Sequence, residues 1–567
     1  MTPNTPQDTP SQDPTSPDGA DSRSEPRSEE DVPVPGEPVG DRRTALPLTA
    51  DELPGRAESL LAQGYRVALV AGHHDIDGAA NVNVDTGADR GGGRLRAVYL
   101  FTAPATGGAT GAIPDRRVEL HVPLDASDPR VPSLAALSFP AGRFEREMHD
   151  LFGITPTDHP LPQRLVRHFH WPTGWHPMLA DAGDPPPFGD VDGPYPFRTV
   201  EGPGVYEIPV GPVHAGMIEP GHFRFSVVGE TILNLKARLW FVHKGIEKLF
   251  HGRRPDQGIE LAERISGDTT VGHTLAFCHA IEDALGLTIP ADTHRIRGIL
   301  LELERLYNHI TDIGALCNDV GYGILNTHAQ RVREQLLRIN DEVTGHRLLR
   351  GAIQPGGARL TALLDLDRLA AIGEDIAEIV TLALTNTVVA DRFTGTAVLT
   401  RQQASDLGTL GYVARASGLA LDARHDHPTL TEDHPRAEHT RTDGDVLSRF
   451  LVRAEEISHS LNRITHLAET LDGSLGDERA TAPGAPTTGS VTGRLGGRSG
   501  VGIVEGWRGT IVHRVELASD GTLSRVKIVD PSFFNWPALP VALADTIVPD
   551  FPLTNKSFNL SYAGNDL

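Results

Sequence analysis

Thiolates are the protein ligands best suited to redox-active metals, and this chain has few of them. The sequence contains two cysteines, Cys278 and Cys317. Two thiols cannot form a disulfide framework, and they cannot supply the four thiolates of an iron–sulfur cluster. We interpret both as small buried residues and expect a reducing compartment.

Histidines close to carboxylates are a second possible metal site. His73 and His74 stand near Asp75 and Asp77, but this spacing is not that of a closed zinc site. We therefore expect a surface loop here and no metal. No Gly-x-Gly-x-x-Gly run stands between a predicted strand and a predicted helix, so a dinucleotide such as NADH would bind to a partner and not to this chain.

The length and charge of the chain exclude several classes of protein. Its 567 residues exceed what one hydrophobic core usually organises, so two or more domains are expected. The formal charge of −23 disfavours nucleic acid as a partner, because an acidic chain neutralises no phosphate. No apolar run reaches the ~18 residues of a membrane span, and the polar N-terminus does not resemble a signal peptide. A peripheral position on a membrane complex remains open.

Two structured regions are expected to position the candidate site residues. Residues 1–47 are predicted to be a disordered tail, because the first forty residues hold nine prolines and nine acidic residues and almost no apolar surface. Residues 48–155 predict a small α+β domain. Its expected elements are helices at 51–63 and 144–152, the second ended by Gly153, and an antiparallel sheet of 65–70, 94–101 and 117–122 with a turn at 91–93. Residues 156–200 predict an extended linker.

The second region, 201–567, is predicted to be mainly helical. A hairpin of 205–210 and 223–228 precedes long segments with apolar residues at helical spacing: 232–249, 259–287, 295–313, 329–344, 366–385 and 446–470. A loop is expected at 473–500, strands at 502–504, 510–517 and 524–529, and no regular structure after residue 530. The predicted fold class is therefore α+β: a small antiparallel α+β domain followed by a helix-bundle domain with small β-sheets.

An ordered motif ends the first region. It consists of Phe144-Glu145-Arg146-Glu147-Met148-His149-Asp150-Leu151-Phe152-Gly153-Ile154, followed by His159-Pro160 and Arg164-Leu165. A charged amphipathic helix with a glycine cap would explain the composition alone. The ordered combination resembles the signature of the C (30-kDa-type) subunit of respiratory NADH dehydrogenase. This resemblance implies an interface segment, with Glu145, Arg146 and Glu147 as interface charges.

A second set of motifs runs through the helical region. It comprises Gly211-Pro212-Val213-His214, Glu219-Pro220-Gly221-His222-Phe223-Arg224, His243-Lys244-Gly245, Arg297-Gly298, Glu304-Arg305, Asn308-His309 and Gln354-Pro355-Gly356-Gly357. Together these resemble the large subunit of membrane-bound, energy-converting nickel–iron hydrogenases and the D (49-kDa-type) subunit of NADH dehydrogenase. Residues 50–567 are thus similar to a fused C–D subunit of the formate-hydrogenlyase large-subunit kind.

The nickel–iron centre of such hydrogenases takes two pairs of thiolates, because soft sulfur ligands hold low-valent metals. At these positions the resemblance places Ser266 and Thr269, then Ser561 and Gly564. An alcohol is not equivalent to a thiolate, and glycine offers no ligand. Cys278 lies about three helical turns beyond Ser266, so we do not expect its thiol to replace the missing ligand. We therefore interpret the four as degenerate metal-ligand positions and expect no metal and no tightly bound cofactor in this chain.

In NADH dehydrogenase the corresponding cavity accepts a quinone, held by a hairpin histidine and a tyrosine. His214 matches the histidine, whereas Gly267 stands at the tyrosine position, and Tyr562 is a second candidate donor. The resemblance implies an acceptor pocket of His214, Arg264, His273, Arg415, Tyr562 and Asp566. For Arg264, His273 and Arg415, each taken alone, a structural role is the favoured alternative. Glu219 resembles a proton-passing glutamate of hydrogenases, and a hairpin ion pair with Arg224 is its alternative. His214 and Glu219 are the predicted catalytic residues.

Two functions follow as expectations. In the first, the chain is the large hydrophilic subunit of a respiratory complex on the cytoplasmic face of the cell membrane. It passes electrons between an iron–sulfur small subunit, similar to the B subunit of NADH dehydrogenase, and quinone or another small acceptor. Coupling to proton translocation stays open. In the second, it is a non-catalytic scaffold between that partner and antiporter-like membrane subunits. An active nickel–iron hydrogenase is the least favoured, and the electron donor stays open.

Overall fold

A computed structural model describes residues 37–40, 42–75, 94–106, 114–189, 191–215, 218–429, 440–471, 473–476 and 498–567. The turn expected at 91–93 and most of the loop expected at 473–500 lie outside these ranges. So does the tail up to residue 36.

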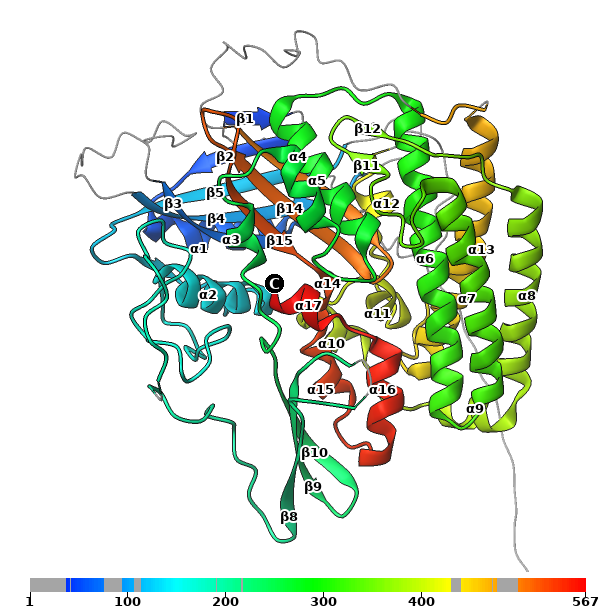
Figure 1. The fold of residues 1–567 in the computed structure, drawn as a ribbon. Helices are drawn as coiled ribbons and strands as arrows, with labels where there is room; N and C mark the ends of the chain where they lie inside the picture. Colours follow the sequence, from blue (N-terminus) through cyan, green and yellow to red (C-terminus); the bar gives the residue numbers. More distant parts are fainter. Residues whose placement is uncertain are drawn as a thin grey trace, which may run out of the picture. The chain divides into compact units, whose positions relative to one another are not determined.

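The N-terminal sheet has five strands in the order β1-β2-β5-β4-β3 (Figure 1). They are β1 (Glu37–Gly40), β2 (Arg43–Pro47), β3 (Arg66–Asp75), β4 (Arg94–Ala103) and β5 (Arg116–Leu124). The antiparallel pairing of β3, β4 and β5 confirms the expected sheet. The prediction of disorder through residue 47 was wrong for β1 and β2. The composition of this segment does not show its order, because tertiary contacts hold β2 in place. Strand β2 pairs in parallel with β5, and the buried Arg43 donates to Glu119 at 3.0 Å.

Helices flank this sheet. A 3-10 turn η1 (Ala50–Glu52) leads into α1 (Leu53–Ala62), and α2 (Phe139–Phe152) packs against β3. Ser138 caps the start of α2 and Gly153, with a φ of 73°, ends it as expected. The short strands β6 (Arg130–Pro132) and β7 (Thr155–Thr157) pair in parallel.

The three charges expected at an interface with another subunit lie inside this chain. Glu145 is fully buried and accepts hydrogen bonds from the Leu134 amide at 2.7 Å and the Ser133 hydroxyl at 2.5 Å. Arg146 donates to the Gln163 carbonyl at 2.7 Å, and Glu147 pairs with Lys527 at 2.8 Å. Through Glu147 the segment therefore contacts the second region of the same chain.

The second region opens on a three-stranded sheet of β8 (Val205–Val210), β9 (His222–Val228) and β10 (Thr231–Arg238). The predicted β8–β9 hairpin is confirmed, but the helix predicted over 232–249 was wrong. The chain forms β10 there, followed by the short α3 (Ile246–Phe250). A shift in register between Ile232 and Asn234 breaks the alternation of buried and exposed residues, which made the spacing resemble that of a helix.

The helix bundle contains α6 (Ala291–Asp319), α7 (Gly323–Thr344), α8 (Leu366–Thr385) and α13 (Val446–Thr470), as the periodicity predicted. Helix α6 packs against α7 and α13. The single helix predicted over 259–287 is instead α4 (Pro255–Ala262) and α5 (Thr270–Leu285), and the break between them carries Ser266 and Thr269. The smaller elements are β11 (Ile353–Gln354), β12 (Gly357–Ala358), α9 (Thr387–Phe393), α10 (Arg401–Asp406), α11 (Gly411–Ala416) and α12 (Ala423–Asp426).

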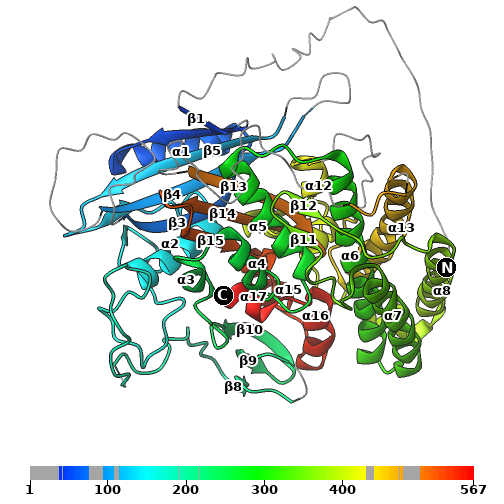
Figure 2. The same cartoon turned by 45° about the horizontal axis from the view of Figure 1, so that its top comes forward.

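A C-terminal antiparallel sheet consists of β13 (Arg498–Gly506), β14 (Gly509–Leu517) and β15 (Leu523–Val529) (Figure 2). Helix α5 lies on it so closely that a β-carbon at Gly500 or Gly502 would collide with α5 carbonyl oxygens. The tail, expected to be irregular, forms α14 (Pro531–Asn535), α15 (Ala538–Ala542), η2 (Val548–Asp550), α16 (Phe551–Phe558) and α17 (Tyr562–Asp566). Residues 36–567 together form one compact unit.

Candidate functional site

The four positions that the resemblance assigns to metal ligands converge although they are distant in sequence. The hydroxyl oxygens of Ser266 and Ser561 lie 2.8 Å apart. Ser561 also caps α17, since its Oγ accepts from the Gly564 amide at 2.9 Å. Thr269 stands at the start of α5, three residues after Ser266. The break between α4 and α5 and the start of α17 therefore form one cluster of hydroxyl groups.

This cluster is closed by an ion pair that the sequence did not reveal. Asp268 accepts from Ser266 at 3.1 Å and from Thr269 at 3.0 Å, and Arg508 donates to it at 2.6 and 2.7 Å. Burial would raise the pKa of Asp268, but the charge and hydrogen bonds of Arg508 outweigh it and lower the pKa to about 2. Trp507 donates from Nε1 to Thr269 at 3.2 Å. The hydroxyls of Ser266, Thr269 and Ser561 are all engaged within the protein.

Asp530 occupies the space that a side chain at position 564 would need. A β-carbon added at Gly564 would lie 2.5 Å from the Asp530 Cγ atom. This carboxylate is fixed: it accepts from His273 Nε2 at 2.9 Å and from the Ser532 amide at 2.7 Å. His273 lies against His513, with 3.1 Å between Nδ1 and Nε2. The predicted pocket residue His273 thus reaches the cluster through Asp530.

These donors do not fit a nickel–iron centre. The four positions offer hydroxyl oxygens and a glycine, and the hydroxyls are hydrogen-bonded to one another and to Asp268. Cys278 and Cys317 are buried in α5 and α6, among the apolar residues of the bundle core. Burial raises the pKa of the Cys278 thiol, and it raises that of Cys317 to about 12. Neither thiol is poised to act as a thiolate ligand.

The two predicted catalytic residues lie on the loop between β8 and β9, beside α17. His214 Nε2 is hydrogen-bonded to the Gly221 carbonyl at 2.8 Å. Gly221 also lies against Tyr562, because a β-carbon there would be 2.6 Å from the Tyr562 ring. Glu219 accepts from the Ala563 amide at 3.0 Å. The structure thus brings His214, Glu219 and Tyr562 together at the N-terminal end of α17.

The alternative partner of Glu219 is occupied elsewhere. Arg224 lies 3.5 Å from Glu207 and over the Phe197 ring. The hairpin ion pair between Glu219 and Arg224 is therefore not formed, and Glu219 binds α17 instead.

Of the three further predicted pocket residues, Arg264 and Arg415 lie apart from this group, whereas the charge of Asp566 acts on both Glu219 and Tyr562. Arg264 is at the surface, with 45% of its side chain exposed, and pairs with Glu260 at 3.2 Å. Arg415 is buried between Glu456 at 2.6 Å and Glu505 at 2.8 Å, where it connects α11 with α13 and β13. Asp566 is on α17 but accepts from the Val242 amide at 3.1 Å, and burial raises its pKa to about 6. Their contacts within the described residues do not join Arg264 or Arg415 to the cluster.

The histidine pair near residue 73 is not in a surface loop, because His73 and His74 belong to β3. His73 is buried, and its ring lies 3.4 Å from Glu516. Arg96 donates both to Asp75 at 2.6 Å and to Glu516 at 2.5 Å, and Arg514 donates to Glu516 at 2.6 Å. Two guanidinium groups already neutralise these carboxylates, which favours an ion-pair network over a metal site. Asp77 lies outside the described residues.

Asp530, Arg508 and Trp507 are the site residues that sequence reasoning missed. Each follows or connects strands of the C-terminal sheet, in segments whose periodicity predicts only strand or loop. No spacing signal in the sequence links them to residues 266–269. Among the helices in the described ranges, none has the length and apolarity needed to cross a bilayer.

Comparisons with known proteins match three stretches of the chain to family models. Residues 61–184 match the family model of the 30-kDa subunit of respiratory-chain NADH dehydrogenase, 244–317 that of nickel-dependent hydrogenase and 319–566 that of the 49-kDa subunit. The chain is 31% identical to formate hydrogenlyase subunit 5 of Escherichia coli over 79% of each chain. It is 27% identical to the C/D subunit of the NADH-quinone oxidoreductase of Phocaeicola vulgatus, over 60% of this chain and 70% of the relative.

A solved structure shares the fold. It belongs to the membrane-bound sulfane sulfur reductase, an archaeal respiratory membrane complex, and aligns with a TM-score of 0.56 and 24% identity over 64% of this chain and 99% of that chain. The mixed α+β fold predicted from the sequence is thereby confirmed. The chain belongs to the family of fused 30-kDa/49-kDa-type large subunits that respiratory NADH dehydrogenases share with formate hydrogenlyase and related membrane-bound hydrogenases.

Proposed function

We propose that this chain is the large hydrophilic subunit of a membrane-associated respiratory oxidoreductase. In this proposal it lies on the cytoplasmic face of the membrane, next to an iron–sulfur small subunit and antiporter-like membrane subunits. Electrons pass from the partner's cluster to quinone or another small acceptor bound beside α17. The observation that carries the proposal is the meeting of His214, Glu219 and Tyr562 around Gly221 and Ala563.

These side chains suit an acceptor that takes up electrons together with protons. With Nε2 bound to the Gly221 carbonyl, His214 keeps Nδ1 for a proton. Burial raises the pKa of Tyr562 to about 12, so its hydroxyl stays protonated at neutral pH and can donate to a carbonyl oxygen. Glu219 is an exposed carboxylate beside them and can exchange protons with solvent.

The proposal excludes hydrogen turnover at a nickel–iron centre. It rests on the poor fit of the hydroxyl cluster to such a centre and on the space that Asp530 takes at position 564. Stoichiometric nickel in the purified complex, measured by elemental analysis, would overturn this part.

A scaffold without catalysis is the second candidate. The observation that favours it is the satisfied hydrogen bonding of Ser266, Thr269 and Ser561, which closes the former ligand positions. In that case the chain would only link the iron–sulfur partner to the membrane subunits, and no variant near α17 would change electron transfer while the complex assembles.

The His214→Ala variant separates the two candidates. We expect the intact complex to assemble with all its subunits but to lose most of its quinone reduction. His251→Ala is the matched control, because this exposed histidine contacts the Ser524 carbonyl, away from α17. Unchanged quinone reduction in the His214 variant would contradict an acceptor site here and favour the scaffold.

A further inference from the structure

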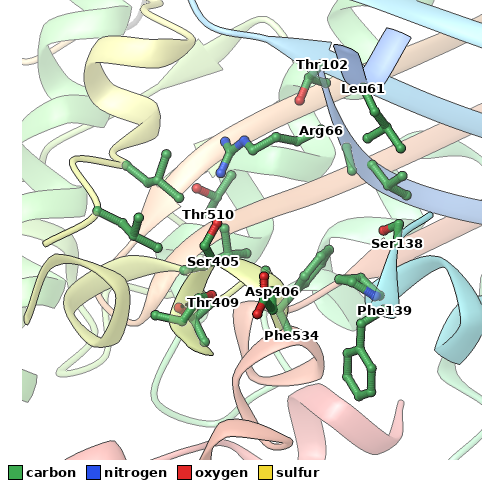
Figure 3. Close-up of a pocket in the computed structure, with 18 of the residues that line it drawn as sticks. Leu61, Arg66, Thr102, Ser138, Phe139, Ser405, Asp406, Thr409, Thr510 and Phe534 are labelled. Atoms are coloured by element: carbon green, nitrogen blue, oxygen red, sulfur yellow. Dashed lines mark hydrogen bonds between the residues drawn. The ribbon is translucent and has the colours of Figure 1, made fainter. Parts of the chain in front are cut away.

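A cavity of about 590 Å³ lies where the N-terminal sheet meets the C-terminal sheet and the α10–α11 segment (Figure 3). It is separate from the cluster at α17, since the two share no residue. Its volume lies within the range of small-molecule sites, about 300–1,000 Å³. Much of its wall is apolar, with contributions from Leu61, Val67, Leu410, Ile503, Val512 and Phe534.

One cation projects into this apolar space. Arg66 extends from β3 into the cavity, towards Thr510 (Figure 3). Within the described part of the chain, its guanidinium makes no hydrogen bond and no ion pair. The remaining lysines and arginines of the described residues do not line the cavity. A planar group with five N–H donors is thus offered to whatever enters, and unpaired donors in an apolar site favour an acceptor that carries charge.

The surrounding charges determine which anion fits. Burial lowers the pKa of Arg66, while the nearby carboxyl groups of Asp426 and Glu505 raise it again, and the guanidinium stays charged. Asp406 adds a carboxylate to the lining, and His427 lines the wall with a pKa lowered by burial, so it is neutral at pH 7. The guanidinium supplies one positive charge, which a single negative charge neutralises, whereas the nearby carboxylates repel the second negative charge of a dianion.

We propose that this cavity binds an amphipathic monoanion: a carboxylate that pairs with Arg66 and an apolar body that fills the space between the two sheets. A carboxylate matches the guanidinium in planar, two-point geometry, and an alkyl or aromatic body matches the apolar walls. A phosphate headgroup offers the same oxygen acceptors but carries more charge near neutral pH. Binding at this site would make the packing between the two fused regions depend on the concentration of a small acid.

Calorimetric titration of the full chain tests this with three probes of equal chain length: decanoate, 1-decanol and decyl phosphate. We expect decanoate to bind at least tenfold more tightly than 1-decanol, because a hydrogen bond to a charged group contributes that much when buried. Decyl phosphate should bind more weakly than decanoate. Absence of decanoate binding, equal binding of the alcohol, or tighter binding of the phosphate would each overturn the proposal.

Variants locate the site. Arg66→Gln should weaken decanoate at least tenfold and leave 1-decanol unchanged, and Arg66→Lys should recover part of the loss. Arg264→Gln is the matched control, because this exposed arginine does not line the cavity and should not change binding. If Arg66→Gln does not fold, the Ala136→Trp variant tests the site instead, because the larger side chain narrows the cavity while Arg66 is retained. Undiminished decanoate binding in Arg66→Gln, or in Ala136→Trp, would overturn the assignment.

Discussion

Replacement of Gly564 by alanine tests whether Asp530 fills the space at the fourth predicted ligand position. The new β-carbon would lie 2.5 Å from the Asp530 Cγ atom and 2.5 Å from its Oδ2 atom. Asp530 is buried and holds both His273 and the Ser532 amide, so it cannot retreat without breaking these bonds. The same collision would occur with cysteine, so the outcome also shows whether a thiolate could stand at this position.

Two losses and one gain determine how the Gly564→Ala replacement changes the free energy of unfolding. Overpacking a tight interior costs about 1–3 kcal/mol. Loss of the hydrogen bond between Asp530 and His273, which involves a charged group, costs about 1.5–3 kcal/mol. The higher helix propensity of alanine relative to glycine offsets about 0.5–1 kcal/mol of this destabilisation. We therefore expect the free energy of unfolding to fall by about 2–5 kcal/mol.

Equilibrium unfolding of the full chain in urea measures this change. Gly267→Ala is the matched control, since it lies in the same cluster segment but a β-carbon there meets nothing within 4 Å. It should change stability by less than about 0.5 kcal/mol. Gly564→Ala combined with Asp530→Ser should recover part of the loss, because the smaller side chain leaves room. A Gly564→Ala chain as stable as the control would refute the reasoning.

Two more predictions concern buried charged residues, Glu145 on α2 and Lys527 on β15. Burial raises the pKa of Glu145 from 4.5 to about 7, against the hydrogen bonds from Ser133 and Leu134, so the folded chain holds this proton more tightly than the unfolded chain. Its contribution to stability is therefore complete below pH 4.5 and is lost as the pH rises to about 7; Glu145→Gln should flatten urea stability over this window, and an unchanged slope would contradict the assignment. Lys527 bridges Glu147 at 2.8 Å and Glu247 at 3.1 Å, so Lys527→Met should cost about 3–5 kcal/mol by leaving buried carboxylates without it. The exposed Lys248→Met is its control in thermal unfolding, and equal effects of the two would argue against a bridging role.

Local pattern predicted much of the fold. The helices α6, α7, α8 and α13 are long and amphipathic, so their apolar spacing is unambiguous. The errors arose where a local pattern admits two structures: a register shift made β10 resemble a helix, and the break between α4 and α5 follows no loss of helical spacing. Strand β2 was missed because a parallel partner and a buried arginine, and not its composition, hold it in the sheet.

The sequence by itself determined that only two thiols exist and that His214, Glu219, Ser266 and Ser561 occur in a recognisable order. Only the tertiary structure decided which of these meet. Ser266 and Ser561 are 295 positions apart, and their contact depends on how closely α5 packs on the glycines of β13 and on the turn that begins α17. The resemblance placed Arg264 and Arg415 in the same pocket, yet neither side chain reaches the site. Arg264 lies at the protein surface, and Arg415 is bound by two buried carboxylates. Periodicity reports the face of an element, whereas the packing of distant elements determines which faces share a site.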